Sequence, residues 1–257
     1  MSQPFQVYLD VSRQSPRVMA HVLEPPGLGI RFETRSAFEE GMTASLAEHL
    51  SWLASHGHWV GSPPQHPAWQ VAEEYPVDGN FESGDDVGFY EPDLEPLTAA
   101  DVERYLAIAR SAREDLLALV RALPPGALEW RLNERSRPIR DILKHVAGAE
   151  LWYITRILDD PERVDMPPEL VELDRRMDAA DDPVERLRMV REGFERFFRS
   201  LPEERLNRVV VPTWFCDIQT ERWTARKALR RAIEHEREHT RSIRRTIAAH
   251  LRATSPG

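Results

Sequence analysis

The sequence predicts a multidomain α+β protein in which a small β-β-β-α-β domain precedes an up-down four-helix bundle. Strand-like segments are confined to the first third of the chain, and long amphipathic segments occupy residues 98–251. A segment rich in proline, glycine and acidic residues lies between them. We therefore divide the 257 residues into an α+β domain with its acidic linker, residues 1–95, and a helical domain, residues 96–257.

The first domain is expected to contain four strands and one helix. Alternating patterns and branched or aromatic residues predict strands over residues 5–11, 17–23, 29–32 and 69–75. Apolar residues that recur every three or four positions over residues 36–55 predict an amphipathic helix, which Gly57 ends. This order gives a small sheet that one helix covers.

The first domain resembles the HicB-like antitoxin fold. The resemblance is carried by the element order, by Pro26-Gly27, and by the helix opening Ala37-Phe38-Glu39-Glu40, and it covers about 75 residues. Members of that family usually bind DNA and pair with a toxin, but no helix-turn-helix or basic arm follows here. Residues 1–95 carry 15 acidic and 4 basic residues, a net charge of −11 that would repel a phosphate backbone, so we expect no nucleic-acid partner.

The second domain is expected to be a bundle of four long helices, because four amphipathic segments follow one another with short breaks. We place these helices over residues 98–123, 139–158, 184–201 and 224–251. Thr98 with Asp101 predicts a capping box, and Thr224 predicts the start of the last helix. A short helix over residues 168–177 belongs to the connection between the second and third helices.

Composition excludes several classes of protein. The chain contains no run of 18 apolar residues and its start lacks the order of a signal peptide, so we expect a cytoplasmic protein without a membrane span. A single cysteine, Cys216, excludes an internal disulfide framework and a multi-cysteine metal site. Four histidines between residues 49 and 66 lack regular ligand spacing, which favours capping or solvated roles over a metal cluster.

Three histidines of the second domain form a candidate metal site. His235 and His239 are four residues apart, so a helix projects both from one face, about 6 Å apart along its axis. His145 lies on the inward stripe of the second helix and is the third imidazole that we expect there. Three neutral histidines leave coordination positions open, as in catalytic metal sites. The alternative is that they are core or surface histidines on charged helices.

Neighbouring residues would shape this site. Gly148 and Ala149 lie one turn after His145 and remove side-chain bulk, and Trp152 would form a wall of the pocket. Glu236 and Glu238 flank the last-helix histidines and could orient them, although a glutamate beside arginine on a helix is more often a solvated ion pair.

The helical domain resembles the DinB-like superfamily of metal-binding four-helix bundles. The segments RPIRDILKHVAGAELWYITRIL and WTARKALRRAIEHEREHTRSIRRTI carry this resemblance, which extends over residues 97–251. It implies that His145, His235 and His239 hold a divalent ion such as zinc, nickel or iron. Arg137-Pro138 stands where Trp-Ser is common in the family, so the loop beside the site is altered.

The resemblance implies two kinds of function. Characterised branches include thiol-dependent S-transferases and a mycothiol-dependent maleylpyruvate isomerase, which suggests a transferase or isomerase acting on a small-molecule substrate. A low-molecular-weight thiol or a metal-bound water would serve as the nucleophile. The alternative is a non-catalytic metal-binding or protein-interaction protein whose acidic first domain docks a partner. The sequence does not choose between catalysis and binding, and it leaves open a homodimer.

Overall fold

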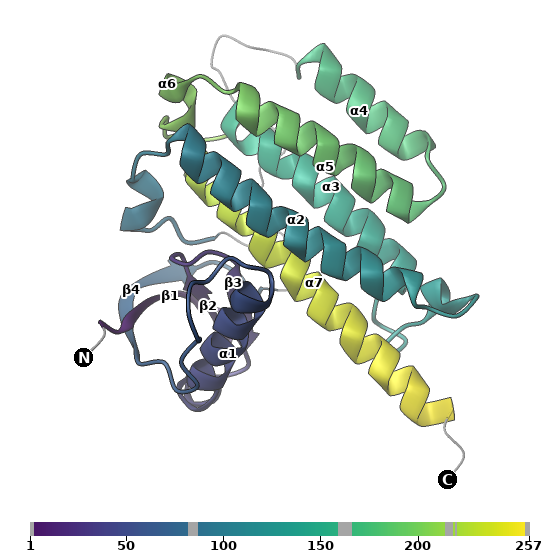
Figure 1. Ribbon diagram of the computed structural model, residues 1–257, viewed down its shortest axis with the longest axis horizontal. Coiled ribbons are helices and arrows are strands. Elements are labelled where there is room, and N and C mark those ends of the chain that lie inside the picture. Colours follow the sequence, from purple (N-terminus) through teal and green to yellow (C-terminus); the bar gives the residue numbers. More distant parts are fainter. Residues whose placement is uncertain (1–2, 82–86, 159–165, 214–217, 219, 255–257) are drawn as a thin grey trace.

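The structure has two parts that meet along the last helix, α7 (Ala225–Thr254) (Figure 1). It is a computed structural model that describes residues 3–81, 87–158, 166–213, 218 and 220–254. Cys216 lies outside the described residues. A small sheet with one helix forms the first part and long helices form the second, so the expected multidomain α+β class is confirmed.

The first part is a four-stranded sheet with the strand order β3-β2-β1-β4. Strand β1 pairs antiparallel with β2 and parallel with β4, and helix α1 makes the crossover between β3 and β4. The expected order β-β-β-α-β is confirmed. The elements are β1 (Phe5–Ser12), β2 (Val18–Val22), β3 (Leu28–Phe32), α1 (Arg35–Ser55) and β4 (Trp69–Val77).

The two faces of the sheet have different partners. Val7 and Leu9 share a buried apolar cluster with Phe38 of α1, because side chains of a strand alternate between its faces. The other face presents Tyr8 and Asp10, which are 8% and 0% exposed. Other parts of the chain therefore cover the face of the sheet that carries these polar side chains.

The second part contains four long helices and several short ones. The long helices are α2 (Ala99–Arg121), α3 (Ile139–Leu158), α5 (Pro183–Ser200) and α7, and the short ones are α4 (Pro168–Ala179), α6 (Glu203–Leu206), η1 (Glu91–Leu94) and η2 (Ala127–Glu129). The capping box of Thr98 and Asp101 is confirmed, and Thr224 accepts a hydrogen bond from the Lys227 N–H at the start of α7. Among the described residues, no helix is both long enough and apolar enough to cross a membrane.

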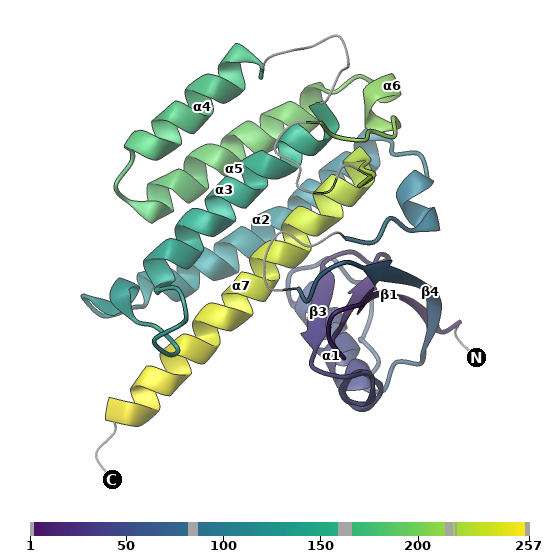
Figure 2. The ribbon, with the colours of Figure 1, turned by 180° about the vertical axis from the view of Figure 1, so that it is seen from behind.

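The long helices do not alternate strictly in direction, which corrects the expected up-down order. The start of α2 lies beside the start of α7, where Tyr105 contacts Arg226. It also lies beside the end of α5, where Glu103 contacts Arg199. Helix α2 is therefore parallel to α7 and antiparallel to α5. The reason is α4, which returns the chain between α3 and α5, so that these two helices run in the same direction (Figures 1 and 2).

A ring of four buried ionic side chains joins the bundle helices. Its members come one from each long helix and are at most 6% exposed: Arg113, Glu150, Arg191 and Glu236. Each arginine bonds both glutamates; for example, Arg113 donates to Glu150 at 2.7 Å and Arg191 donates to Glu236 at 2.5 Å. Because the ring has no net charge and every member is paired, it fixes how each helix is rotated about its own axis.

The sheet packs closely against α7. A Cβ atom added to Gly29 of β3 would lie 2.9 Å from Cβ of Glu234, so only glycine permits this approach. One buried apolar cluster extends through both parts and includes Leu9, Leu143 and Ile233. The division at residue 95 stays a prediction, since apolar contacts and ion pairs continue across it.

Candidate metal centre

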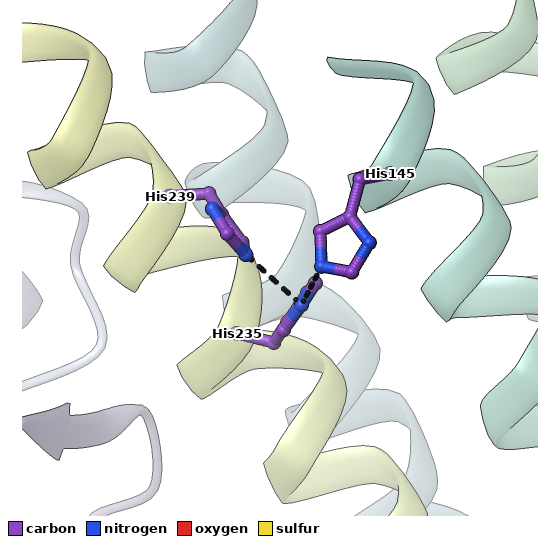
Figure 3. A group of neighbouring side chains, drawn as sticks. All are labelled: His145, His235 and His239. Carbon is purple, nitrogen blue, oxygen red and sulfur yellow. Dashed lines mark hydrogen bonds between the residues drawn. The ribbon is translucent and has the colours of Figure 1, made fainter. Parts of the chain in front are cut away.

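His145, His235 and His239 come together between α3 and α7 (Figure 3). The Nε2 atom of His235 lies 3.0 Å from Nε2 of His145 and 3.1 Å from Nε2 of His239. One nitrogen from each ring lies within 4.8 Å of the others, and all three side chains are half-buried. Helices α3 and α7 run antiparallel at this point. The ring of His145 contacts His239, whereas the ring of Tyr153, which comes later in α3, contacts His235, which comes earlier in α7.

The rotation of α7 determines which of its residues meet α3. His235 and His239 lie one turn apart on the same face. The next residue, Glu236, points about 100° away and enters the buried ionic ring. The preceding residue, Glu234, points toward the sheet and bonds His21. With its neighbours fixed on both sides, His235 is directed at His145.

The three imidazoles are neutral at physiological pH. Burial lowers the pKa of His145 to about 4, with further contributions from repulsion by the protonated form of His239 and from the positive charge of Arg137. Burial and Arg137 lower the pKa of His239 to about 4. Burial and the two other histidines hold the pKa of His235 well below its usual value. A neutral imidazole has the free lone pair that a metal ion requires.

The nitrogen positions fit a shared cation better than a set of hydrogen bonds. A ring nitrogen of neutral histidine either donates one hydrogen or accepts through one lone pair. The Nε2 atom of His235 has two close nitrogen neighbours, so at most one of these contacts can be a good hydrogen bond. Nitrogens at 2.0–2.1 Å from one tetrahedral ion lie about 3.3 Å apart, close to the 3.0 and 3.1 Å between Nε2 of His235 and the other two rings.

A family comparison covers this part of the chain. The model of the DinB superfamily matches residues 108–243, more than half of the sequence, and the match includes all three histidines. The chain belongs to the DinB superfamily. Residues 1–107 lie outside the match, so the HicB-like resemblance of the first domain stays a prediction.

Two further comparisons of this DinB chain concern solved structures and proteins with curated descriptions. A solved structure that matches it is described as "YfiT from Bacillus subtilis is a probable metal-dependent hydrolase with an unusual four-helix bundle topology". The match has 15% sequence identity and a TM-score of 0.44, and it covers 66% of this chain and 97% of YfiT. Among proteins with curated descriptions, none matches this chain.

The expected pocket residues of the DinB bundle differ in their exposure and in the side chains that they contact. Gly148 is exposed, and a Cβ atom added there would meet nothing within 4 Å, so this side of His145 is open. Ala149 is half-buried next to it. The ring that packs edge-on against His235 is that of Tyr153, at 6.1 Å, whereas Trp152 packs against Tyr153 and Trp223. Tyr153 is thus a further aromatic residue beside the site, and a pocket wall formed by Trp152 stays a prediction.

The side chains of Glu236 and Glu238 contact arginines. Both carboxylate oxygens of Glu236 accept hydrogen bonds from Arg113 and Arg191 in the ionic ring. The carboxylate of Glu238 lies 3.7 Å from the guanidinium of Arg31 in β3. The expectation that Glu236 orients a metal ligand is therefore wrong, because its side chain points into the bundle core and not toward the rings.

Sequence reasoning missed two arginines near the site. The positive charge of Arg137 lowers the pKa of all three histidines, and the charge of Arg31 lowers that of His239. Arg137 had a signal in the sequence, since it stands at the position where this chain departs from the usual Trp-Ser of the family. Arg31 had none, because its place beside α7 depends on how the two domains pack.

Proposed function

We propose that this DinB protein binds one divalent metal ion through Nε2 of His145, His235 and His239, and that the centre is catalytic. The observation that carries the proposal is the convergence of three neutral ring nitrogens on one point at the protein surface. Zinc, nickel and iron all accept imidazole ligands.

The surroundings favour catalysis over a structural role for the ion. Structural zinc sites are closed by four protein ligands, whereas catalytic sites keep a position for a reactant. Here three candidate ligands are half-buried, and Gly148 leaves space beside them. When bound, a divalent ion lowers the pKa of a water or thiol ligand and so supplies a nucleophile near neutral pH. We propose a transferase or isomerase reaction that uses a low-molecular-weight thiol or water.

Metal analysis of the untagged protein tests the site. We expect about one equivalent of metal in the wild type, and its loss in His145→Ala, His235→Ala and His239→Ala, because two imidazoles rarely hold an ion alone. His250→Ala is the matched control, since His250 lies on α7 but stacks on Trp130 at 4.7 Å. Metal retained in all three single variants would contradict the ligand assignment.

A turnover assay separates the enzyme from a non-catalytic metal-binding protein. The metal-loaded protein is incubated with monochlorobimane and a series of low-molecular-weight thiols, and conjugate fluorescence is followed. We expect conjugation with at least one thiol, and its loss in His239→Ala. Absence of turnover with every thiol, in protein that retains its metal, would favour the non-catalytic alternative.

A further inference from the structure

A cavity of about 300 Å³ lies between the sheet domain and the bundle, and none of the three histidines lines it. Strand β1 and the segment after β2 form one part of its wall, and residues of α2, α7 and the segment around η1 form the other. Its volume is at the lower end of the range for small-molecule pockets. Five charged residues belong to the wall: Glu24, Asp93, Glu95, Arg226 and Arg230.

Two of the acidic side chains in the wall are neutralised by arginines. Arg230 is fully buried and donates hydrogen bonds to both carboxylate oxygens of Asp93, each at 2.7 Å. Arg104 of α2 donates to both oxygens of Glu24, at 2.5 and 2.9 Å. Because each of these guanidinium groups is matched to one carboxylate, both pairs present little net charge to a ligand.

Arg226 is a buried cation whose hydrogen-bond partners are uncharged. The residue is 8% exposed, and its guanidinium donates to the carbonyl groups of Glu95 and Pro96 at 3.0 and 2.9 Å. It also reaches the Tyr105 hydroxyl at 3.4 Å. In the part of the chain that the structure describes, no carboxylate forms an ion pair with it. Since buried charges are normally paired, Arg226 is suited to receive an anionic group from the cavity.

Glu95 supplies the opposite charge at the same end of the cavity. Its carbonyl accepts the hydrogen bond from Nε of Arg226, so the two residues are neighbours in the wall. The Glu95 side chain is exposed, and among the described residues no basic side chain forms an ion pair with it. Once the internal ion pairs are set aside, the wall therefore keeps one positive and one negative charge, side by side.

Another part of the wall is apolar. Tyr8, Leu23 and Tyr105 are at most 8% exposed, and Phe5 is half-buried. Three of these side chains are aromatic, and their rings offer flat hydrophobic surfaces. Such a wall favours a ligand that has an apolar body as well as charged groups.

We propose that this cavity binds an α-amino acid with an aliphatic or aromatic side chain. The α-carboxylate pairs with Arg226 and the α-ammonium group pairs with Glu95, because the ligand carries these two charges as close together as the wall does. The apolar side chain lies against Phe5, Tyr8 and Leu23. Neither a simple anion nor a simple cation would satisfy both charges of the wall.

This site is separate from the candidate metal centre. Arg226 precedes His235 by nine residues, which is about 14 Å along α7 and about half a turn around it. The two residues therefore face opposite sides of the helix, and the proposal does not depend on a bound metal.

Isothermal titration calorimetry of the metal-free full chain tests the proposal, because an amino acid could otherwise bind through the metal. The probes are L-phenylalanine and L-leucine, with phenylacetate, which lacks the ammonium group, and phenethylamine, which lacks the carboxylate. We expect saturable binding of at least one of the two amino acids. Phenylacetate and phenethylamine should each bind about tenfold or more weakly than L-phenylalanine or L-leucine, whichever binds better, the effect of one lost charge-assisted hydrogen bond.

Single variants test the role of each charge. Glu95→Gln should weaken amino-acid binding about tenfold and leave the affinity for phenylacetate unchanged. Arg226→Gln should weaken the binding of both, in protein whose fold is verified by circular dichroism. Glu91→Gln is the matched control, since Glu91 is an exposed residue of the same segment that does not line the cavity, and it should bind like the wild type.

Three results would overturn the proposal: no saturable binding of either amino acid, binding of phenylacetate or phenethylamine as tight as that of the amino acids, or unchanged amino-acid affinity in Glu95→Gln. Because Glu95 is exposed, its variant decides the question even if Arg226→Gln does not fold.

Discussion

His21 of strand β2 and Glu234 of helix α7 are joined by a hydrogen bond of 2.9 Å although 213 positions separate them in the chain. The other ring nitrogen of His21 lies 3.0 Å from Asp10, and all three side chains are fully buried. Because Glu234 directly precedes His235, this contact ties the sheet domain to the helix turn that carries the candidate metal ligands.

Loss of this buried contact should destabilise the whole chain. Glu234→Gln removes the charge that faces His21 and Arg231, which takes away the ion-pair partner of buried Arg231 and leaves His21 with Asp10 as its remaining acidic partner. We expect the free energy of unfolding to fall by about 3 kcal/mol, as for other broken buried ion pairs. Urea unfolding followed by circular dichroism measures the change. Glu74→Gln, which breaks an exposed ion pair with Arg35, should cost less than about 1 kcal/mol. Equal effects of the two substitutions would contradict the structural role of Glu234.

The same contact gives stability a dependence on pH. Burial alone lowers the pKa of His21, but the negative charges of Glu234 and Asp10 outweigh it and raise the pKa above the usual 6.5. The folded chain therefore keeps a proton that the unfolded chain releases. This contribution is fully present below pH 6.5 and is lost as the pH rises through the raised pKa.

Unfolding in urea with a chelator present, at several pH values above 6.5, measures this loss. Relative to His21→Gln, the wild type should lose stability across that range, because glutamine does not titrate. The candidate ligands have the same lowered pKa values in both proteins, so their contribution cancels in the difference between the two profiles. A wild-type profile as flat as that of the variant would exclude a proton held by His21.

Local patterns in the sequence predicted the helices and the histidines of the candidate metal site, but they did not predict the polar contacts between helices. The second helix has the expected bounds, Ile139–Leu158, and the spacing of His235 and His239 places them on one face as expected. Glu236 looked like a solvated residue or a helper of the ligands, because the helix around it is rich in charge. Its true partners, Arg113 and Arg191, lie on other helices, and no local pattern identifies such contacts.

The four-helix ionic ring should contribute strongly to stability. Arg191→Met keeps the apolar length of the side chain but leaves Glu150 and Glu236 short of a partner in the core. We expect a loss of about 3 kcal/mol, because buried carboxylates are left incompletely paired. Arg199→Met is the control on the same helix, since Arg199 is 40% exposed and pairs with Glu103. It should lose less than about 1 kcal/mol in the same urea titration. Similar losses for both variants would show that the ring is not the stabilising element.

Gly148 should tolerate a methyl group with a gain in stability. It lies exposed within α3, and an added Cβ atom would meet nothing within 4 Å. Gly148→Ala should raise the free energy of unfolding by about 0.5–1 kcal/mol, because glycine costs helix-forming free energy relative to alanine. Gly29→Ala should lower it, since the new Cβ atom would lie 2.9 Å from Glu234 where the sheet packs on α7. Thermal unfolding of both variants measures the contrast, and a loss of stability in Gly148→Ala would show that the space beside His145 is not open.

The lowered pKa values of the histidines predict metal retention in mild acid. Protons compete with a metal for imidazole lone pairs, and the competition begins near the pKa of the free ligand. With values of about 4 for His145 and His239, the site should keep its ion at pH 5.5, where an ordinary histidine with a pKa of 6.5 is mostly protonated. Dialysis at a series of pH values, followed by metal analysis, measures the release. A midpoint of metal release near pH 6.5 would mean that the three rings are more hydrated than their burial indicates. Protons would then bind them as readily as in the unfolded chain.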